Sequence, residues 1–144
     1  MNIDSIKNGI VIDHIKAKKG LEIYDLLKLG DLDCSVAIIT NAKSEKMGRK
    51  DIIKIDDDIN IDLDVLGYID PNSTVNIIKD GKLVKKCHLE LPEKLTNVIK
   101  CKNPRCITSI ETNCDHIFEL SLSGRYRCLY CNQEMPVGTK FAGH

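Results

Sequence analysis

Four cysteines stand at spacings that favour a metal site. Cys101 and Cys106 enclose four residues, and Cys128 and Cys131 enclose two, which gives the pattern C-x4-C followed by C-x2-C. Each pair can supply half of a tetrahedral set, and Zn²⁺ binds sulfur ligands at about 2.3 Å. A site closed by four thiolates leaves no position for water or substrate. The pattern therefore predicts one structural zinc ion and no catalytic metal.

The residues around these cysteines suit a zinc site. Asn103 and Pro104 lie inside the first pair and are typical of a tight turn, in which backbone N–H groups can point at thiolate sulfurs. Two further residues, Cys114 and His116, remain rival ligands, because either could replace one of the four thiols. Basic side chains beside the ligands can offset the negative charge of the thiolates; they are Lys100, Lys102, Arg105 and Arg127.

The compartment expected for this chain favours zinc over disulfides. The first residues are polar and lack the apolar core of a signal peptide. No run approaches the roughly 18 apolar residues that cross a membrane. We therefore expect a soluble cytoplasmic protein, in which thiols stay reduced and can bind metal.

Composition weighs against two other classes of function. The 144 residues include 21 basic and 21 acidic side chains, so the net charge is zero and no global field attracts nucleic acid. A nucleic-acid-binding zinc ribbon remains an alternative, because basic residues flank the cysteines. An enzyme acting alone is a weaker alternative, since no phosphate-binding glycine loop is present. Cys87 and His88, as strand neighbours, would face opposite ways and make a poor catalytic pair.

Hydrophobic patterning predicts an N-terminal α+β domain. Strands are expected at residues 9–15, 34–40, 51–56, 73–79 and 82–86, and helices at residues 20–30 and 60–67. Asp80-Gly81 between the last two strands is a strong hairpin signal. The first six elements follow the β-α-β-β-α-β order of ferredoxin-like domains, in which both helices cover one face of an antiparallel sheet. The other face would be open to a ligand or a partner.

Local features of the helices and connections are also predicted. Leu21, Tyr24 and Leu27 recur at helical spacing and would form the apolar stripe of the first helix, with Ile23 and Leu26 as further candidates. Residues 41–50 are polar and are expected to form a turn-rich link. The three aspartates at residues 56–58 are expected to form a solvated turn that caps the second helix.

Strand geometry predicts which way individual side chains point. Along the strand at 51–56, Ile53 and Ile55 would face one side and Lys54 the other. Asp13 and His14 are neighbours at the end of the first strand. At most one of these two would therefore point into a given pocket.

A second domain begins where the pattern breaks at Pro92. We expect residues 1–92 to form the first domain and residues 93–144 a small β domain resembling a zinc ribbon. About fifty residues bury little apolar area, so a structural metal would supply what the core cannot. The segments 117–122 and 125–128 would form a hairpin around a Ser-Gly turn, just before the second cysteine pair.

Several motifs together resemble one known family, the regulatory chain of aspartate carbamoyltransferase. The cysteine pattern is the most specific of them, and the order and spacing of the others add to it. Those others are Gly9-Ile-Val-Ile-Asp-His-Ile15, Met47-Gly-Arg-Lys-Asp-Ile-Ile-Lys-Ile55, Thr74-Val-Asn-Ile-Ile78 and Leu91-Pro-Glu93. The resemblance runs from Ile6 to about Pro136, nearly the whole chain.

The resemblance implies a noncatalytic subunit. In the family, the N-terminal domain binds nucleoside triphosphates such as CTP, ATP and UTP and pairs regulatory chains into dimers. The zinc domain docks on a catalytic chain, and three regulatory dimers link two catalytic trimers. The nucleotides control pyrimidine biosynthesis by shifting a two-state equilibrium of this assembly.

Matching positions imply a nucleotide pocket and a partner interface in this chain. The implied pocket residues are Ser5, Ile6, Val11, Asp13, His14, Lys50, Ile52, Lys54, Asn76, Ile78, Leu83 and Lys86, and the implied interface residues are Asn103 and Tyr130. Their chemistry is suitable, because Lys54, Lys86 and His14 supply cations for a triphosphate. Asp13 can accept a hydrogen bond from a ribose hydroxyl, and Asn76 can both donate to and accept from a base edge.

Overall fold

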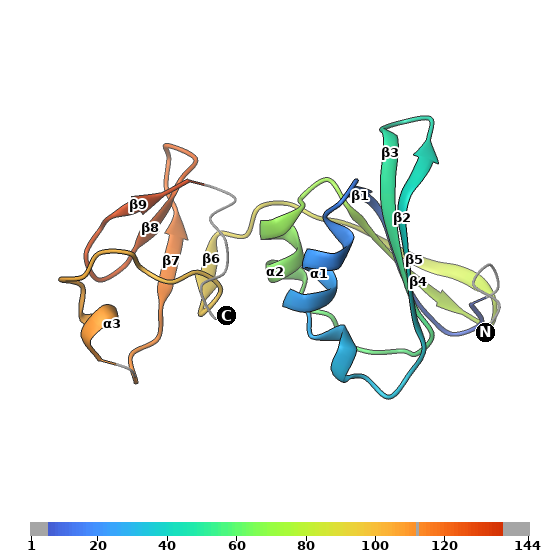
Figure 1. Ribbon diagram of the computed structural model, residues 1–144, viewed down its shortest axis with the longest axis horizontal. Helices are drawn as coiled ribbons and strands as arrows, with labels where there is room; N and C mark the ends of the chain where they lie inside the picture. Colours follow the sequence, from blue (N-terminus) through green and yellow to red (C-terminus); the bar gives the residue numbers. More distant parts are fainter. Residues whose placement is uncertain (1–5, 112, 137–144) are drawn as a thin grey trace. The chain divides into compact units, whose positions relative to one another are not determined.

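The computed structural model describes residues 6–111 and 113–136. The chain divides into two compact units, residues 1–90 and 91–144. The first contains a five-stranded sheet and the second a four-stranded sheet. Short helices accompany each sheet (Figure 1), so the α+β fold class predicted from the sequence is confirmed. No helix in the described part of the chain is long and apolar enough to cross a membrane.

The elements of the first unit follow one another in the predicted order. They are β1 (Gly9–Lys16), α1 (Gly20–Leu26), the 3-10 helix η1 (Leu29–Asp31), β2 (Val36–Ser44), β3 (Gly48–Ile55), α2 (Leu63–Ile69), β4 (Thr74–Lys79) and β5 (Lys82–His88). The strand order is β2-β3-β1-β4-β5, and every neighbouring pair is antiparallel. Figure 1 shows α1 and α2 on the same side of this sheet. This is the ferredoxin-like arrangement with β5 added at one edge.

Isoleucines fill the space between this sheet and its helices. Ile53 and Ile55 of β3 are fully buried, whereas Lys54 between them is half-buried, so the predicted alternation is confirmed. Ile12 of β1 pairs with Ile53 and is also fully buried. Ile23 is fully buried on α1 and contributes to the same core. The sheet therefore keeps one apolar face against the helices.

The first helix is shorter than predicted, and only part of its predicted apolar stripe is buried. The helix ends at Leu26, because Lys28 adopts a left-handed backbone (φ 55°) before η1 begins. Leu21 is 59 % exposed, while Ile23 is buried. A helix of two turns presents few side chains to the core, so its spacing pattern alone did not exclude Leu21 from the buried side.

The polar segment at residues 41–50 is not a loose link but part of a long hairpin. β2 continues to Ser44, and β3 begins at Gly48, which has φ 78°. A bulge follows Ile39, where Asn41 also has a positive φ. Backbone pairing extends past the core here, and polar side chains do not prevent it. Asn and Gly tolerate the left-handed backbone that the bulge and the turn require.

The cap of the second helix lies later than predicted. The Asp62 carboxylate accepts hydrogen bonds from the backbone N–H groups of Asp64 and Val65, at 3.1 and 3.2 Å. Asp62 therefore fills the N-cap position of α2. The aspartates at residues 56–58 lie exposed in the preceding bend and do not cap the helix.

The second unit contains β6 (Lys94–Thr96), α3 (Ile107–Ile110), β7 (Ile117–Leu120), β8 (Tyr126–Cys128) and β9 (Glu134–Met135), with strand order β6-β7-β8-β9. The predicted hairpin is present as β7 and β8. Its core includes the fully buried rings of Phe118 and Tyr126. The Tyr126 hydroxyl donates to the Pro92 carbonyl at 2.7 Å, which ties the start of the unit to its sheet.

Candidate metal centre and candidate ligand face

The four cysteines predicted as zinc ligands converge in the second unit. Their sulfur atoms all lie within 4.8 Å of one another. The Cys101 and Cys131 sulfurs are 3.5 Å apart, and the Cys106 and Cys128 sulfurs are 3.8 Å apart. Sulfur ligands around a tetrahedral ion with bonds of about 2.3 Å stand about 3.8 Å apart. The cluster therefore has the dimensions of a structural zinc site.

Tight turns bring each cysteine pair to the cluster. The Cys106 N–H donates to the Asn103 carbonyl at 3.1 Å, and the Arg105 N–H donates to the Asn103 side-chain oxygen at 3.0 Å. At the second pair, the Asn132 N–H donates to the Cys128 carbonyl at 2.9 Å. Asn132 has a left-handed backbone (φ 64°), which closes this turn. Local hydrogen bonds thus stabilise both turns, including the one predicted at the first pair.

Backbone amides point at the sulfurs, but burial has the larger effect on the pKa of Cys101 and Cys128. Burial raises the pKa of Cys101 to about 12, against a hydrogen bond from the Asn103 amide. Burial likewise raises the pKa of Cys128. Burial also opposes ionisation of Cys131, yet hydrogen bonds led by that from the Gln133 amide lower its pKa to about 7. At neutral pH, metal binding must therefore displace protons from the cluster.

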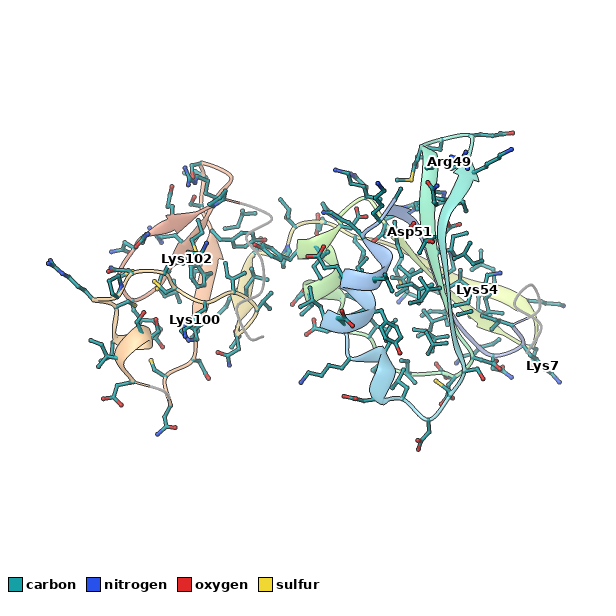
Figure 2. The ribbon with its side chains drawn as sticks, viewed as in Figure 1. Lys7, Arg49, Asp51, Lys54, Lys100 and Lys102 are labelled. Atoms are coloured by element: carbon teal, nitrogen blue, oxygen red, sulfur yellow. The ribbon has the colours of Figure 1, made fainter. Side chains whose placement is uncertain are left out.

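The two rival ligands lie near the cluster but outside it. Neither Cys114 nor His116 belongs to the group of close ligand atoms found among the described residues. The Nδ1 atom of His116 lies 3.5 Å from the Cys101 backbone nitrogen. Cys114 instead lies beside Tyr130 and raises the pKa of its hydroxyl group. Around the cluster the basic residues remain exposed, and Figure 2 labels two of them, Lys100 and Lys102.

Strand register brings a second group of predicted residues onto one face of the first sheet. Val11 pairs with Lys54 on one side and with Asn76 on the other, and Asn76 pairs with Lys86. Directly paired residues lie on the same face of a sheet. Figure 2 shows Lys54 on the side away from the helices and Asp51 on the helix side. We call the side without helices the open face.

Register and burial together assign the strand residues of the open face. They are Val11, Asp13, Lys16, Ala37, Ile39, Ala42, Lys50, Ile52, Lys54, Thr74, Asn76, Ile78, Leu83, Lys86 and His88. This face includes most of the residues that the sequence placed in a nucleotide pocket. Sequence reasoning did not place six of the open-face residues there: Lys16, Ala37, Ile39, Ala42, Thr74 and His88. Their positions follow only from the strand register, which cannot be read from the local sequence.

A β-bulge changes the expected directions of Asp13 and His14. The register between β1 and β3 shifts between Ile12 and Ile15, and His14 has φ 57°. The Asp13 carboxylate forms a salt bridge with the Lys50 ammonium at 2.9 Å, and His14 Nδ1 lies 3.0 Å from the Thr74 hydroxyl. Both partners belong to the open face. The prediction that at most one of the two neighbours points into a given pocket was therefore wrong, because a bulge interrupts strand alternation.

The salt bridge also sets the ionisation of Asp13. Burial alone would raise the pKa of this carboxyl group. Hydrogen bonds from Lys50 and from the His14 amide outweigh that effect and lower the pKa of Asp13 below its ordinary value. Asp13 is therefore a carboxylate, able to accept hydrogen bonds, under ordinary conditions.

Ser5 and Ile6 are the two predicted pocket residues that precede β1. Ser5 lies outside the described residues. Ile6 is buried (7 % exposed) and packs against Gly9, where a Cβ would approach its side chain to 2.9 Å. At the same end of the sheet, Leu83 is 59 % exposed and pairs with Ile78. This end of the open face is apolar.

A buried carboxylate on the helix side of β3 holds the backbone next to the open face in place. Asp51 is fully buried and accepts hydrogen bonds from the backbone N–H groups of Lys18 (3.0 Å), Gly20 (2.8 Å) and Asn41 (2.8 Å). Lys18 and Asn41 both have positive φ. Asp51 therefore fixes the start of α1 and the bulge of β2 against β3, directly beside Lys50.

Comparisons with known proteins agree with both parts of this description. Residues 1–90 match the family model described as aspartate carbamoyltransferase regulatory chain, allosteric domain, and residues 93–137 match the metal binding domain of the same chain. The chain is 53 % identical over 135 residues to the aspartate carbamoyltransferase regulatory chain of Clostridium acetobutylicum, covering 92 % of each. It is 52 % identical to that of Clostridium tetani, covering 92 % of this chain and 94 % of the relative.

A more distant relative gives the same result. The aspartate carbamoyltransferase regulatory chain of Bifidobacterium longum is 46 % identical over 136 residues, covering 93 % of this chain and 98 % of the relative. A regulatory chain implies a catalytic partner chain and allosteric effectors. The four-cysteine cluster lies in the part matched by the metal binding domain and is consistent with structural zinc. The chain thus belongs to the family of aspartate carbamoyltransferase regulatory chains, noncatalytic subunits that combine an allosteric domain with a metal-binding domain.

Proposed function

We propose that the open face of the first domain, residues 1–92, binds the nucleoside triphosphates CTP, ATP and UTP. One observation carries the proposal. In a chain of zero net charge, the strand residues of this face include four lysines, Lys16, Lys50, Lys54 and Lys86, and a single carboxylate, Asp13. A surface with this excess of positive charge attracts a polyanion.

The residues of this face match the parts of a nucleotide. The ammonium groups of Lys54 and Lys86 and the ring of His14 provide donors for phosphate oxygens. The ionised Asp13 accepts from ribose hydroxyls, and the apolar side chains of Ile6, Val11, Ile52, Ile78 and Leu83 contact the base. Asn76 lies between the apolar and the cationic residues and can both donate to and accept from the base.

The second domain, residues 93–144, serves as the rigid connection to the catalytic chain. In this proposal one Zn²⁺ is bound by Cys101, Cys106, Cys128 and Cys131, and the turns that carry these ligands contact the partner. Asn103 and Tyr130 stand on those turns. Tyr130 is 45 % exposed and its neighbour Leu129 is 37 % exposed, which leaves apolar surface for the catalytic chain.

Assembly and location complete the proposal. The strands β2 and β5 form the two edges of the first sheet, and an edge strand can pair with a second copy. Regulatory dimers built in this region would link two catalytic trimers in the cytoplasm. Each nucleotide would act through its different affinity for two states of the assembly, with a coupling of about 1–3 kcal/mol.

Isothermal titration of the intact complex with CTP tests the ligand proposal. Lys86→Gln removes an open-face cation and should weaken CTP binding by about tenfold, the effect of losing one strong charged contact. Lys85→Gln is the matched control, because Lys85 pairs with Ile77 on the other face of the same exposed strand. Equal affinities of the two variants would contradict the assignment of the open face.

A further inference from the structure

Lys16 ends β1 at the cationic end of the open face. The register pairs Ile15 with Asp51 and then Lys16 with Lys50. Ile15 and Asp51 are both fully buried on the helix side. Because successive strand residues alternate, the next pair faces the open side. Two lysines of neighbouring strands therefore stand directly opposite each other on this face.

The two ammonium groups are not equally neutralised. Lys50 forms a salt bridge with Asp13 at 2.9 Å. The Lys16 side chain is exposed and forms no salt bridge within residues 6–111 and 113–136. Like charges that face each other across a strand pair are unfavourable. In the absence of a ligand, the two lysines thus share one salt-bridged carboxylate, that of Asp13.

The backbone of Lys16 is nevertheless held firmly in place. Its N–H donates to the Asp70 carboxylate at 2.7 Å, and Asp70 is only 4 % exposed. The Ser73 hydroxyl in turn donates to the Asp70 carbonyl at 2.8 Å. The side chain of Lys16 therefore projects from a fixed point, which lowers the entropy lost when it binds a ligand.

Along the strands, the open face changes from apolar to cationic. Ile6, Ile78 and Leu83 lie at one end, and Lys50 and Lys16 lie at the other. A nucleoside triphosphate has the same polarity, with an apolar base at one end and its greatest charge at the terminal phosphate. The matching orientation directs the terminal phosphate toward Lys16.

We propose that Lys16 binds the terminal phosphate of the nucleotide and makes the site selective for triphosphates over monophosphates. This inference rests on the proposed nucleotide-binding function. It adds a residue that the sequence did not place in the pocket. The contact also relieves the repulsion between Lys16 and Lys50, because the phosphate supplies the missing negative charge.

Titration of the intact complex with CTP and with CMP tests this role. Lys16→Gln should weaken CTP binding about fivefold, as expected for one partly exposed charged contact, and change CMP binding by less than about twofold. Lys16→Arg keeps the charge and should retain the preference for CTP. Lys85→Gln, on the other face of the edge strand, should alter neither affinity.

Stability of the ligand-free protein provides a second readout. Because Lys16→Gln removes a like-charge contact, its melting temperature without nucleotide should equal or exceed that of the unaltered protein. A lower melting temperature, or equal losses of CTP and CMP affinity, would show a general structural role and overturn the inference. Unchanged CTP binding in Lys16→Gln would also overturn it. If the unaltered complex binds no CTP at all, the nucleotide-binding proposal itself fails.

Discussion

The Lys50 ammonium lies 2.9 Å from the Asp13 carboxylate, across a bulge that turns both Asp13 and His14 toward the same face of the sheet. Without the bulge, these two neighbours would point to opposite sides. The salt bridge links β1 to β3 at the point where the cationic residues of the open face gather. It therefore organises the candidate ligand site before any ligand binds.

The pH dependence of stability should report this salt bridge. The lowered pKa of Asp13 means that its contribution is complete above the unfolded-state value, near 3.8, and is lost as pH falls through the lower folded-state value. Asp13→Asn should remove this contribution, so the stability difference between the two proteins should shrink in acid. Urea denaturation at a neutral and an acidic pH measures it. A difference that grows as the pH falls would contradict the assignment.

Removal of zinc should unfold the second domain selectively. Its core is small, and metal binding and folding are one event in such domains. A chelator should abolish the amide-exchange protection of β7 and β8 while leaving that of β1 and β3 intact, because the first sheet has its own core. Retained protection of β7 and β8 in zinc-free protein would contradict a structural role for the metal.

Zinc affinity should fall as the pH falls. Burial raises the pKa of Cys101 to about 12, so this thiol is protonated in the metal-free cluster at neutral pH. Zinc must displace that proton, and acid favours the protonated form. Competition with a chromophoric chelator at several pH values measures the affinity. The companion measurement is proton release on zinc binding, followed in a weak buffer. A zinc affinity that does not change with pH, together with no proton release, would contradict the proposed ligand set.

The buried carboxylate of Asp51 should be costly to replace. An amide in Asp51→Asn can accept hydrogen bonds on one side only, while three backbone donors from Lys18, Gly20 and Asn41 require acceptors. The expected loss is about 3 kcal/mol in the free energy of unfolding. Asp56→Asn changes an exposed residue in the bend after β3 and is the control. Equal stabilities of the two variants would contradict this role.

Gly67 should tolerate no side chain. A Cβ there would lie 2.5 Å from the Glu90 backbone oxygen, whereas a Cβ at Gly30 would meet the end of the Tyr24 side chain at 2.9 Å. Tyr24 can rotate, but Glu90 can move only with the backbone that leaves the first unit. Gly67→Ala should therefore cost about 2 kcal/mol, and Gly30→Ala less. Urea denaturation compares them, and the reverse order would contradict the close contact.

The sequence predicted those features that depend on neighbouring residues. Asp80-Gly81 requires positive φ at both turn positions, and the structure has φ 53° and 74° there. The cysteine spacings likewise identified the four clustered thiols. The short strands β6 and β9 were missed, because two or three residues show no measurable period.

Features that depend on pairing between distant residues could not be predicted. The bulge beside Asp13 arises from the register between β1 and β3, and so does the placement of Lys16 opposite Lys50. Thr74 contacts His14 across sixty positions of sequence. No local pattern encodes such a contact. The exposure of Leu21 on α1 was decided by packing against the sheet rather than by helical spacing.

Nucleotides bound on the open face should control a catalytic partner chain. The most direct measurement is the aspartate saturation curve of the reconstituted complex, with and without CTP or ATP, beside the isolated catalytic trimer. Nucleotide should shift the curve of the complex and leave that of the trimer unchanged. Its effect should be weaker when the regulatory chain carries Lys86→Gln. A complex whose curve is unaffected by either nucleotide, or a trimer that responds equally, would contradict it.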